Sequence, residues 1–128
     1  MRMRHSGLPK KVLVADKSSF IVRMLEARLG REGYEVVSAF DGDSCVEAAR
    51  RERPDLIMIE WMMTRMSGLE AAKCIKSDPV LSHIPIVMVT YKGQESDRII
   101  AHRAGVVRYV TKPFNIDRLV ALVQEVLI

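Results

Sequence analysis

Short runs of apolar residues alternate along this chain with longer segments in which apolar residues recur every three or four positions. The short runs are typical of buried β-strands, whereas the longer segments are typical of amphipathic helices. The pattern predicts strands at residues 12–16, 35–39, 55–60, 86–90 and 108–111. It predicts helices between and after them: one that ends near Gly33, three at residues 43–52, 68–76 and 95–104, and a last one that follows Asn115.

Capping signals support the first and last of these helices. Ser18 or Ser19 is suited to the N-cap of the first helix, and Gly33 is suited to its end because glycine adopts the left-handed conformation freely. Asn115 is the expected N-cap of the last helix. The apolar stripe of the first helix consists of Ile21, Met24, Leu25 and Leu29.

Strands that alternate with helices indicate an α/β fold, in which a doubly wound parallel sheet carries helices on both faces. In such sheets the ligand site lies at the carboxyl ends of the strands. The polar residues at these ends are Asp16, Lys17, Glu60, Thr90 and Lys112. The first strand is not followed by a glycine-rich loop, which argues against a nucleotide-binding site.

The net charge and the composition of the chain argue against several classes of protein. The chain has 128 residues, enough for one domain, and its net charge of +4 comes from a basic segment before residue 12, since residues 12–128 are balanced. We expect residues 1–10 to be a disordered tail and residues 11–128 to form the domain. A balanced domain argues against nucleic-acid binding, and the absence of a long apolar run argues against a membrane segment. We therefore expect a cytoplasmic protein.

The two cysteines, Cys45 and Cys74, are isolated, and the three histidines are scattered. This spacing argues against a zinc site and favours two reduced, buried or half-buried thiols. Asp16 and Glu60 could also serve a small metal-dependent phosphohydrolase, but no further base or ligand set accompanies them, and we do not expect an enzyme.

Five stretches occur in an order and spacing that resemble one family. They are VLVADKS, GYEVVSAFDG, PDLIMIEWMMTRMSGLE, IPIVMVTYKG and AGVVRYVTKPF. From about Lys11 to Leu127 the chain resembles a receiver domain of two-component response regulators. This resemblance implies a flavodoxin-like (βα)5 fold with strand order 2-1-3-4-5.

The resemblance also implies roles for residues at the strand ends. In receivers the first strand ends in an acidic pair that binds Mg²⁺, and an aspartate after the third strand accepts a phosphoryl group from a histidine kinase. Asp16 matches one member of the pair and Glu60 occupies the acceptor position. The backbone carbonyl of Met62 would be a further Mg²⁺ ligand, if the ion is bound.

A second group of matching residues concerns the switch. Thr90 matches the hydroxyl residue that contacts the phosphoryl group, and Tyr109 matches an aromatic residue that reorients on activation. Lys112 and Pro113 match a Lys-Pro pair that is usually joined by a cis peptide bond.

Two residues differ from the family pattern at positions that bind Mg²⁺ or accept the phosphoryl group. Lys17 replaces the second acid of the pair, and an ammonium group beside the site should weaken Mg²⁺ binding, which depends on oxygen ligands. Glu60 replaces the aspartate, and its extra methylene displaces the attacking oxygen. A misplacement of about 1 Å costs phosphoryl transfer around a hundredfold. We therefore expect weak or absent Mg²⁺ binding and poor phosphorylation.

These departures suggest that the Glu60 carboxylate pairs with Lys112, with Lys17 or with both, so that these residues and Asp16 carry no net charge. The leading hypothesis is a pseudo-receiver that works by protein contact without phosphorylation. The alternatives are a conventional Mg²⁺-dependent receiver and a site that has fallen out of use. The partner surface would lie on the predicted fourth helix, fifth strand and last helix, where several basic residues gather.

Overall fold

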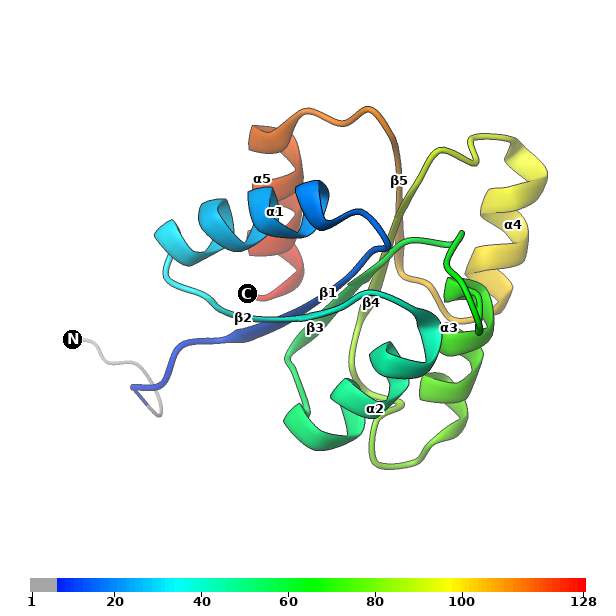
Figure 1. Cartoon of the computed structure of the whole chain (residues 1–128), viewed down its shortest axis with the longest axis horizontal. Coiled ribbons are helices and arrows are strands. Elements are labelled where there is room, and N and C mark those ends of the chain that lie inside the picture. Colours follow the sequence, from blue (N-terminus) through cyan, green and yellow to red (C-terminus); the bar gives the residue numbers. More distant parts are fainter. Residues whose placement is uncertain (1–6) are drawn as a thin grey trace.

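The computed structural model describes residues 7–128 of the chain (Figure 1). The predicted tail therefore lies largely outside the described residues. Five strands alternate with five helices in the order β1 (Lys11–Ala15), α1 (Ser19–Arg31), β2 (Glu35–Ala39), α2 (Gly42–Glu52), β3 (Leu56–Ile59), α3 (Gly68–Ser77), β4 (Ile86–Thr90), α4 (Glu95–Arg103), β5 (Arg108–Thr111) and α5 (Ile116–Val126).

All strands of the sheet are parallel, and they lie in the order β2-β1-β3-β4-β5. Helices α1 and α5 cover one face, whereas α2, α3 and α4 cover the other (Figure 1). The predicted flavodoxin-like fold is thus confirmed, strand order included. Among residues 7–128, no helix has the length and apolar character that crossing a membrane requires.

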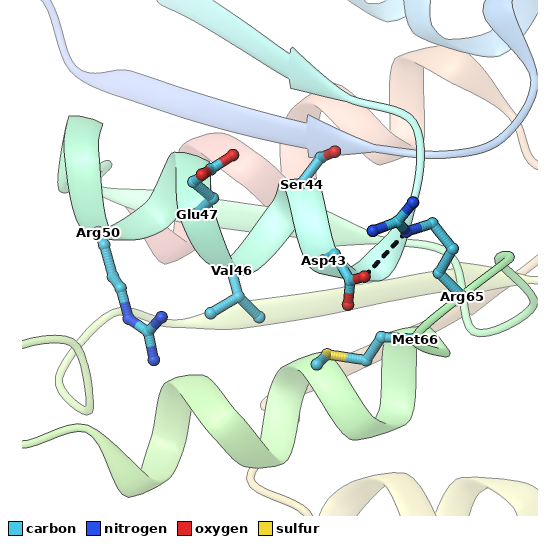
Figure 2. A pocket seen from close by; sticks show the side chains of 7 residues that line it. All are labelled: Asp43, Ser44, Val46, Glu47, Arg50, Arg65 and Met66. Carbon is cyan, nitrogen blue, oxygen red and sulfur yellow. Dashed lines mark hydrogen bonds and ion pairs between the residues drawn. The ribbon is translucent and has the colours of Figure 1, made fainter.

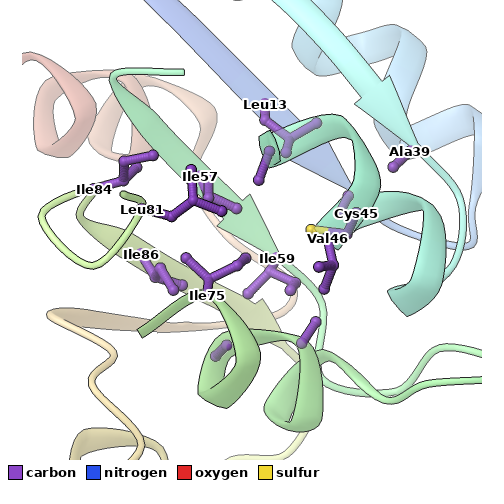
Figure 3. Packing of buried hydrophobic residues seen from close by; sticks show 14 of the residues in the cluster. Leu13, Ala39, Cys45, Val46, Ile57, Ile59, Ile75, Leu81, Ile84 and Ile86 are labelled. Carbon is purple, nitrogen blue, oxygen red and sulfur yellow. The ribbon is translucent and has the colours of Figure 1, made fainter. Parts of the chain in front are cut away.

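The continuous apolar run of β3 reflects burial on both faces of the sheet. Ile57 and Ile59 pack with α2 and α3, whereas Leu56 and Met58 point to the opposite face and pack with α1 and α5. Figure 3 shows the first of these clusters, in which the sheet residues meet Cys45 and Val46 of α2. Strand side chains alternate between faces, so a central strand with helices on both sides has no polar side.

Side-chain caps fix where the helices begin. Ser18, rather than Ser19, accepts a hydrogen bond from the Ile21 amide at the start of α1, and Asn115 caps α5 as expected. Cys45 is buried and Cys74 is half-buried, and both are free thiols, as predicted. The polar residues Asp16 and Glu60 lie one position beyond the ends of β1 and β3, at the start of the loops that form the site.

A buried charge cluster at the carboxyl ends of the strands

Asp16 and Glu60 directly follow two neighbouring strands, β1 and β3, and both side chains are buried. The Glu60 amide donates to the Ala15 carbonyl at 2.9 Å, which fixes the two strand ends side by side. Each of the two residues is only 4% exposed. Burying two carboxylates so close together is strongly unfavourable unless a cation or hydrogen-bond donors compensate.

Lys112 supplies the cation. Its Nζ lies 2.7 Å from Oδ2 of Asp16 and 2.9 Å from Oε1 of Glu60, and its side chain is 5% exposed. Burial is the largest single effect and lowers the pKa of Lys112, but the hydrogen bonds and the charge attraction of Asp16 and Glu60 together outweigh it, and the pKa is raised above its usual value. Lys112 is therefore a permanent ammonium group between two carboxylates. The peptide bond to Pro113 is cis, as the family resemblance implied.

Backbone amides occupy the remaining carboxylate oxygens. The Ser18 amide donates to Oδ1 of Asp16 at 2.9 Å, and the Met62 amide donates to Oε2 of Glu60 at 3.1 Å. All four carboxylate oxygens thus accept a hydrogen bond. Met62, whose carbonyl would be a ligand only if Mg²⁺ were bound, donates its N–H to Glu60.

Lys17 does not join this cluster, which corrects part of the expectation. It is exposed and forms no salt bridge with any residue in the described range 7–128. Lys17 directly follows Asp16 in the loop beyond β1, and its side chain faces the solvent. The buried cluster therefore consists of two carboxylates and one ammonium group, with a charge of −1 rather than zero.

Thr90 and Tyr109 lie on the next two strands. Thr90 is fully buried at the end of β4, and its hydroxyl accepts a hydrogen bond from the Lys92 amide at 3.4 Å. The Tyr109 hydroxyl donates to the Lys92 carbonyl at 2.6 Å. Burial, with the nearby carboxylates of Asp97 and Glu60, raises the pKa of Tyr109 to about 12, although Arg98 opposes the shift.

Close backbone contacts hold the loop between β3 and α3 in place. A Cβ atom at Gly68 would overlap the Glu60 carbonyl oxygen, and one at Gly42 would overlap the Met66 carbonyl oxygen. An ion pair of 2.9 Å joins Arg65 in this loop to Asp43 in α2, and Figure 2 shows the two side chains pointing toward each other. The loop that positions the Glu60 carboxylate is thus bound to both adjoining helices.

The pattern of the sequence did not reveal two lysine–aromatic contacts beside the site. Lys92 Nζ lies 4.8 Å from the centre of the Trp61 ring, and Lys112 Nζ lies 5.4 Å from that of Tyr91. These partners are far apart along the chain and belong to different loops. No periodicity or capping signal in the sequence relates the two partners of either contact. The contacts therefore become apparent only in the folded structure.

The family resemblance implies a Mg²⁺ ion beside Asp16 and Glu60, so the oxygen atoms of these residues must be compared with the ligands that Mg²⁺ needs. Mg²⁺ needs six oxygen ligands in near-octahedral geometry. Here each carboxylate oxygen already accepts a hydrogen bond, and an ammonium group bridges the two acids. Within residues 7–128, no group of three or more His, Cys, Asp or Glu side chains is placed to hold a metal ion. The arrangement described does not fit Mg²⁺.

Comparison with known proteins identifies the family. Residues 12–124 match the model of the response regulator receiver domain. The chain is 36% identical over 118 residues to the alkaline phosphatase synthesis transcriptional regulatory protein PhoP of Bacillus subtilis, covering 92% of this chain and 48% of that protein. It is 37% identical to the response regulator PleD of Caulobacter vibrioides, covering 90% of this chain and 25% of that protein. The chain thus spans about half or less of these relatives.

Solved structures agree with this match. The chemotaxis protein CheY4 of Vibrio cholerae superposes with a TM-score of 0.87 and 30% identity, over 92% of this chain and 98% of that one. The receiver domain of the Francisella response regulator 1452 gives a TM-score of 0.86 and 27% identity, over 92% and 96%. The chain belongs to the response regulator receiver domain family, whose members are signalling modules of two-component systems.

Proposed function

We propose that this chain is a pseudo-receiver, which signals through protein contacts without being phosphorylated. The observation that carries the proposal is the position of Lys112, whose ammonium group bonds both Asp16 and Glu60. The cation neutralises the carboxylate repulsion that a metal ion would otherwise relieve. The cluster is therefore complete without Mg²⁺ and without a phosphoryl group.

The geometry of Glu60 supports the same proposal. Both of its carboxylate oxygens accept hydrogen bonds, from Lys112 and from the Met62 amide, which lower the nucleophilicity of the carboxylate and hold it in one orientation. Phosphoryl transfer depends on positioning and on electrostatic neutralisation of the transferred group, which receivers obtain from Mg²⁺. A carboxylate displaced by one methylene, in a site whose donors do not fit that ion, lacks both contributions.

The proposed partner is another protein of a signalling pathway, and the proposed contact surface lies on α4, β5 and α5. Ile99 and Ile100 of α4 and Val107 beside β5 are large apolar residues that are more than two-fifths exposed. Arg103 and Arg108 are exposed on the same elements. A partner surface with apolar residues flanked by acidic ones would be complementary to this face. We propose no catalytic activity for the chain.

A direct test is incubation with Mg²⁺ and acetyl phosphate, followed by intact-mass measurement. We expect no added phosphoryl group on the wild-type protein. The matched control is the double variant Lys17→Asp, Glu60→Asp, which restores both acids of the family pattern and should gain one phosphoryl group. Addition of a phosphoryl group to Glu60 of the wild-type protein would overturn the proposal.

A conventional phosphorylatable receiver is the second candidate function, because several of the residues that such a receiver needs lie at the expected positions. Asp16, Thr90 and Lys112 all lie at the carboxyl ends of their strands, where the family resemblance requires them. On this alternative, Lys112 would leave Glu60 when Mg²⁺ and a phosphoryl donor bind. The same intact-mass experiment decides between the two candidates.

A further inference from the structure

Lys92, two residues beyond β4, contacts both the loop that follows Glu60 and the first turn of helix α4. Its Nζ lies 4.8 Å from the Trp61 ring centre and 3.6 Å from Oδ1 of Asp97. Trp61 directly follows Glu60, whereas Asp97 lies in the first turn of α4. The Lys92 side chain thus spans from the loop that carries the acid to the helix on the proposed contact surface.

The backbone of Lys92 is held as well. Its N–H donates to the Thr90 hydroxyl at 3.4 Å, and its carbonyl accepts the Tyr109 hydroxyl at 2.6 Å. The main chain of this residue is therefore fixed to β4 and β5. Because the Lys92 backbone is held in place, its side chain can contact Trp61 and Asp97 at the same time.

Asp97 has a second contact that gives the connection an effect on α4. Its other oxygen, Oδ2, accepts the Gln94 amide at 3.2 Å as part of the capping box at the start of the helix. Such caps stabilise the first turn of a helix. The side chains of Lys92 and Asp97 are 35% and 15% exposed, so their ion pair is partly shielded from water. Lys92 therefore supports the group that caps α4.

We propose that Lys92 is a positioning residue that couples the state of Glu60 to helix α4. A change at Glu60 moves the adjoining Trp61, which changes its contact with the Lys92 ammonium group and thereby the Lys92–Asp97 pair at the start of α4. The part of this proposal that concerns signalling rests on the proposed function, since α4 belongs to the proposed contact surface. The coupling itself is a property of the free protein.

The first experiment removes the charge with Lys92→Met and measures hydrogen exchange of the α4 amides. Cation–π contacts and partly exposed ion pairs are individually modest, so we expect exchange in residues 95–103 to become about threefold to tenfold faster. Trp61 emission should change as well. Lys92→Arg should restore both values because it keeps the cation, and Lys73→Met on the exposed surface of α3 should leave both unchanged.

The second experiment tests the coupling with Glu60→Gln. In the wild-type background we expect this change to alter α4 exchange severalfold, whereas in the Lys92→Met background it should have no further effect. An equal effect in both backgrounds, or no effect in either, would overturn the proposal. Asp97→Asn breaks the same connection from the other end and replaces Lys92→Met if that variant fails to fold.

These measurements use the free protein without Mg²⁺ or a phosphoryl donor. A phosphorylated wild-type protein would refute the proposed function and leave the coupling result valid. Conversely, loss of the coupling would leave the phosphorylation result valid.

Discussion

The Lys112 ammonium group lies 2.9 Å from Oε1 of Glu60, the residue to which the family resemblance assigns the acceptor position. The same ammonium group lies 2.7 Å from Asp16. A cation held by two buried carboxylates is a stable arrangement only while all three groups are present.

Replacing Lys112 with methionine should strongly destabilise the fold. It leaves two buried carboxylates without their cation, and breaking such a cluster costs about 3–5 kcal/mol in the free energy of unfolding. Denaturation with urea measures the loss.

A second substitution provides the control for Lys112→Met. Adding Glu60→Gln removes one of the two buried carboxylates that have lost their cation, and it should recover part of the lost stability. A loss below about 1 kcal/mol for Lys112→Met alone is the value expected of an exposed ion pair, and it would show that the cluster is not buried in solution.

Two glycines form a matched pair. A methyl group at Gly68 would overlap the Glu60 carbonyl oxygen, so Gly68→Ala should lower the free energy of unfolding by about 1–3 kcal/mol. A methyl group at Gly30, in α1, meets no atom within 4 Å, so Gly30→Ala should raise it by about 0.4–1 kcal/mol. Thermal or urea unfolding of both variants measures the difference. Equal effects would contradict the described loop conformation.

The alkaline titration of Tyr109 is a further prediction. Its pKa of about 12 exceeds the usual 10.0, so between these values the native state retains a proton that the unfolded state loses. The stability should therefore be intact below pH 10 and fall as the pH rises from 10 to about 12. The raised pKa of Lys112 acts in the same direction.

Tyrosinate absorbance, recorded together with the unfolding curve, follows this titration. Tyr109→Phe should remove the transition near pH 12 and make the decline in stability less steep. If the transition that this substitution removes lies near pH 10 instead, the hydroxyl is not buried against the Lys92 carbonyl.

The positions of the strands and helices were predictable from the sequence, because the spacing of buried apolar residues differs between the two kinds of element. Residues 35–39, 86–90 and 108–111 are strands as expected, and the other elements differ by one or two residues at their ends. Position at a strand end also predicted that Asp16, Glu60 and Lys112 would meet. These are properties of periodicity and of parallel-sheet topology.

The direction of individual side chains beyond a strand end was not predictable in the same way. Lys17 lies next to Asp16 in sequence but is exposed, whereas Lys112, distant in sequence, is inside the cluster. The roles of the Ser18 and Met62 amides depend on loop conformation, which side-chain patterns do not encode. The Trp61–Lys92 contact depends on the relative position of two loops.

The most direct test of the central claim is an Mg²⁺ titration of the wild-type protein, with and without beryllofluoride, which imitates an acyl phosphate. Trp61 adjoins Glu60, so its fluorescence reports occupancy of the site, and calorimetry provides the second reading. We predict no saturable change up to tens of millimolar Mg²⁺, whether or not beryllofluoride is present. A saturable change that requires beryllofluoride would contradict the account and make this chain a phosphorylation switch.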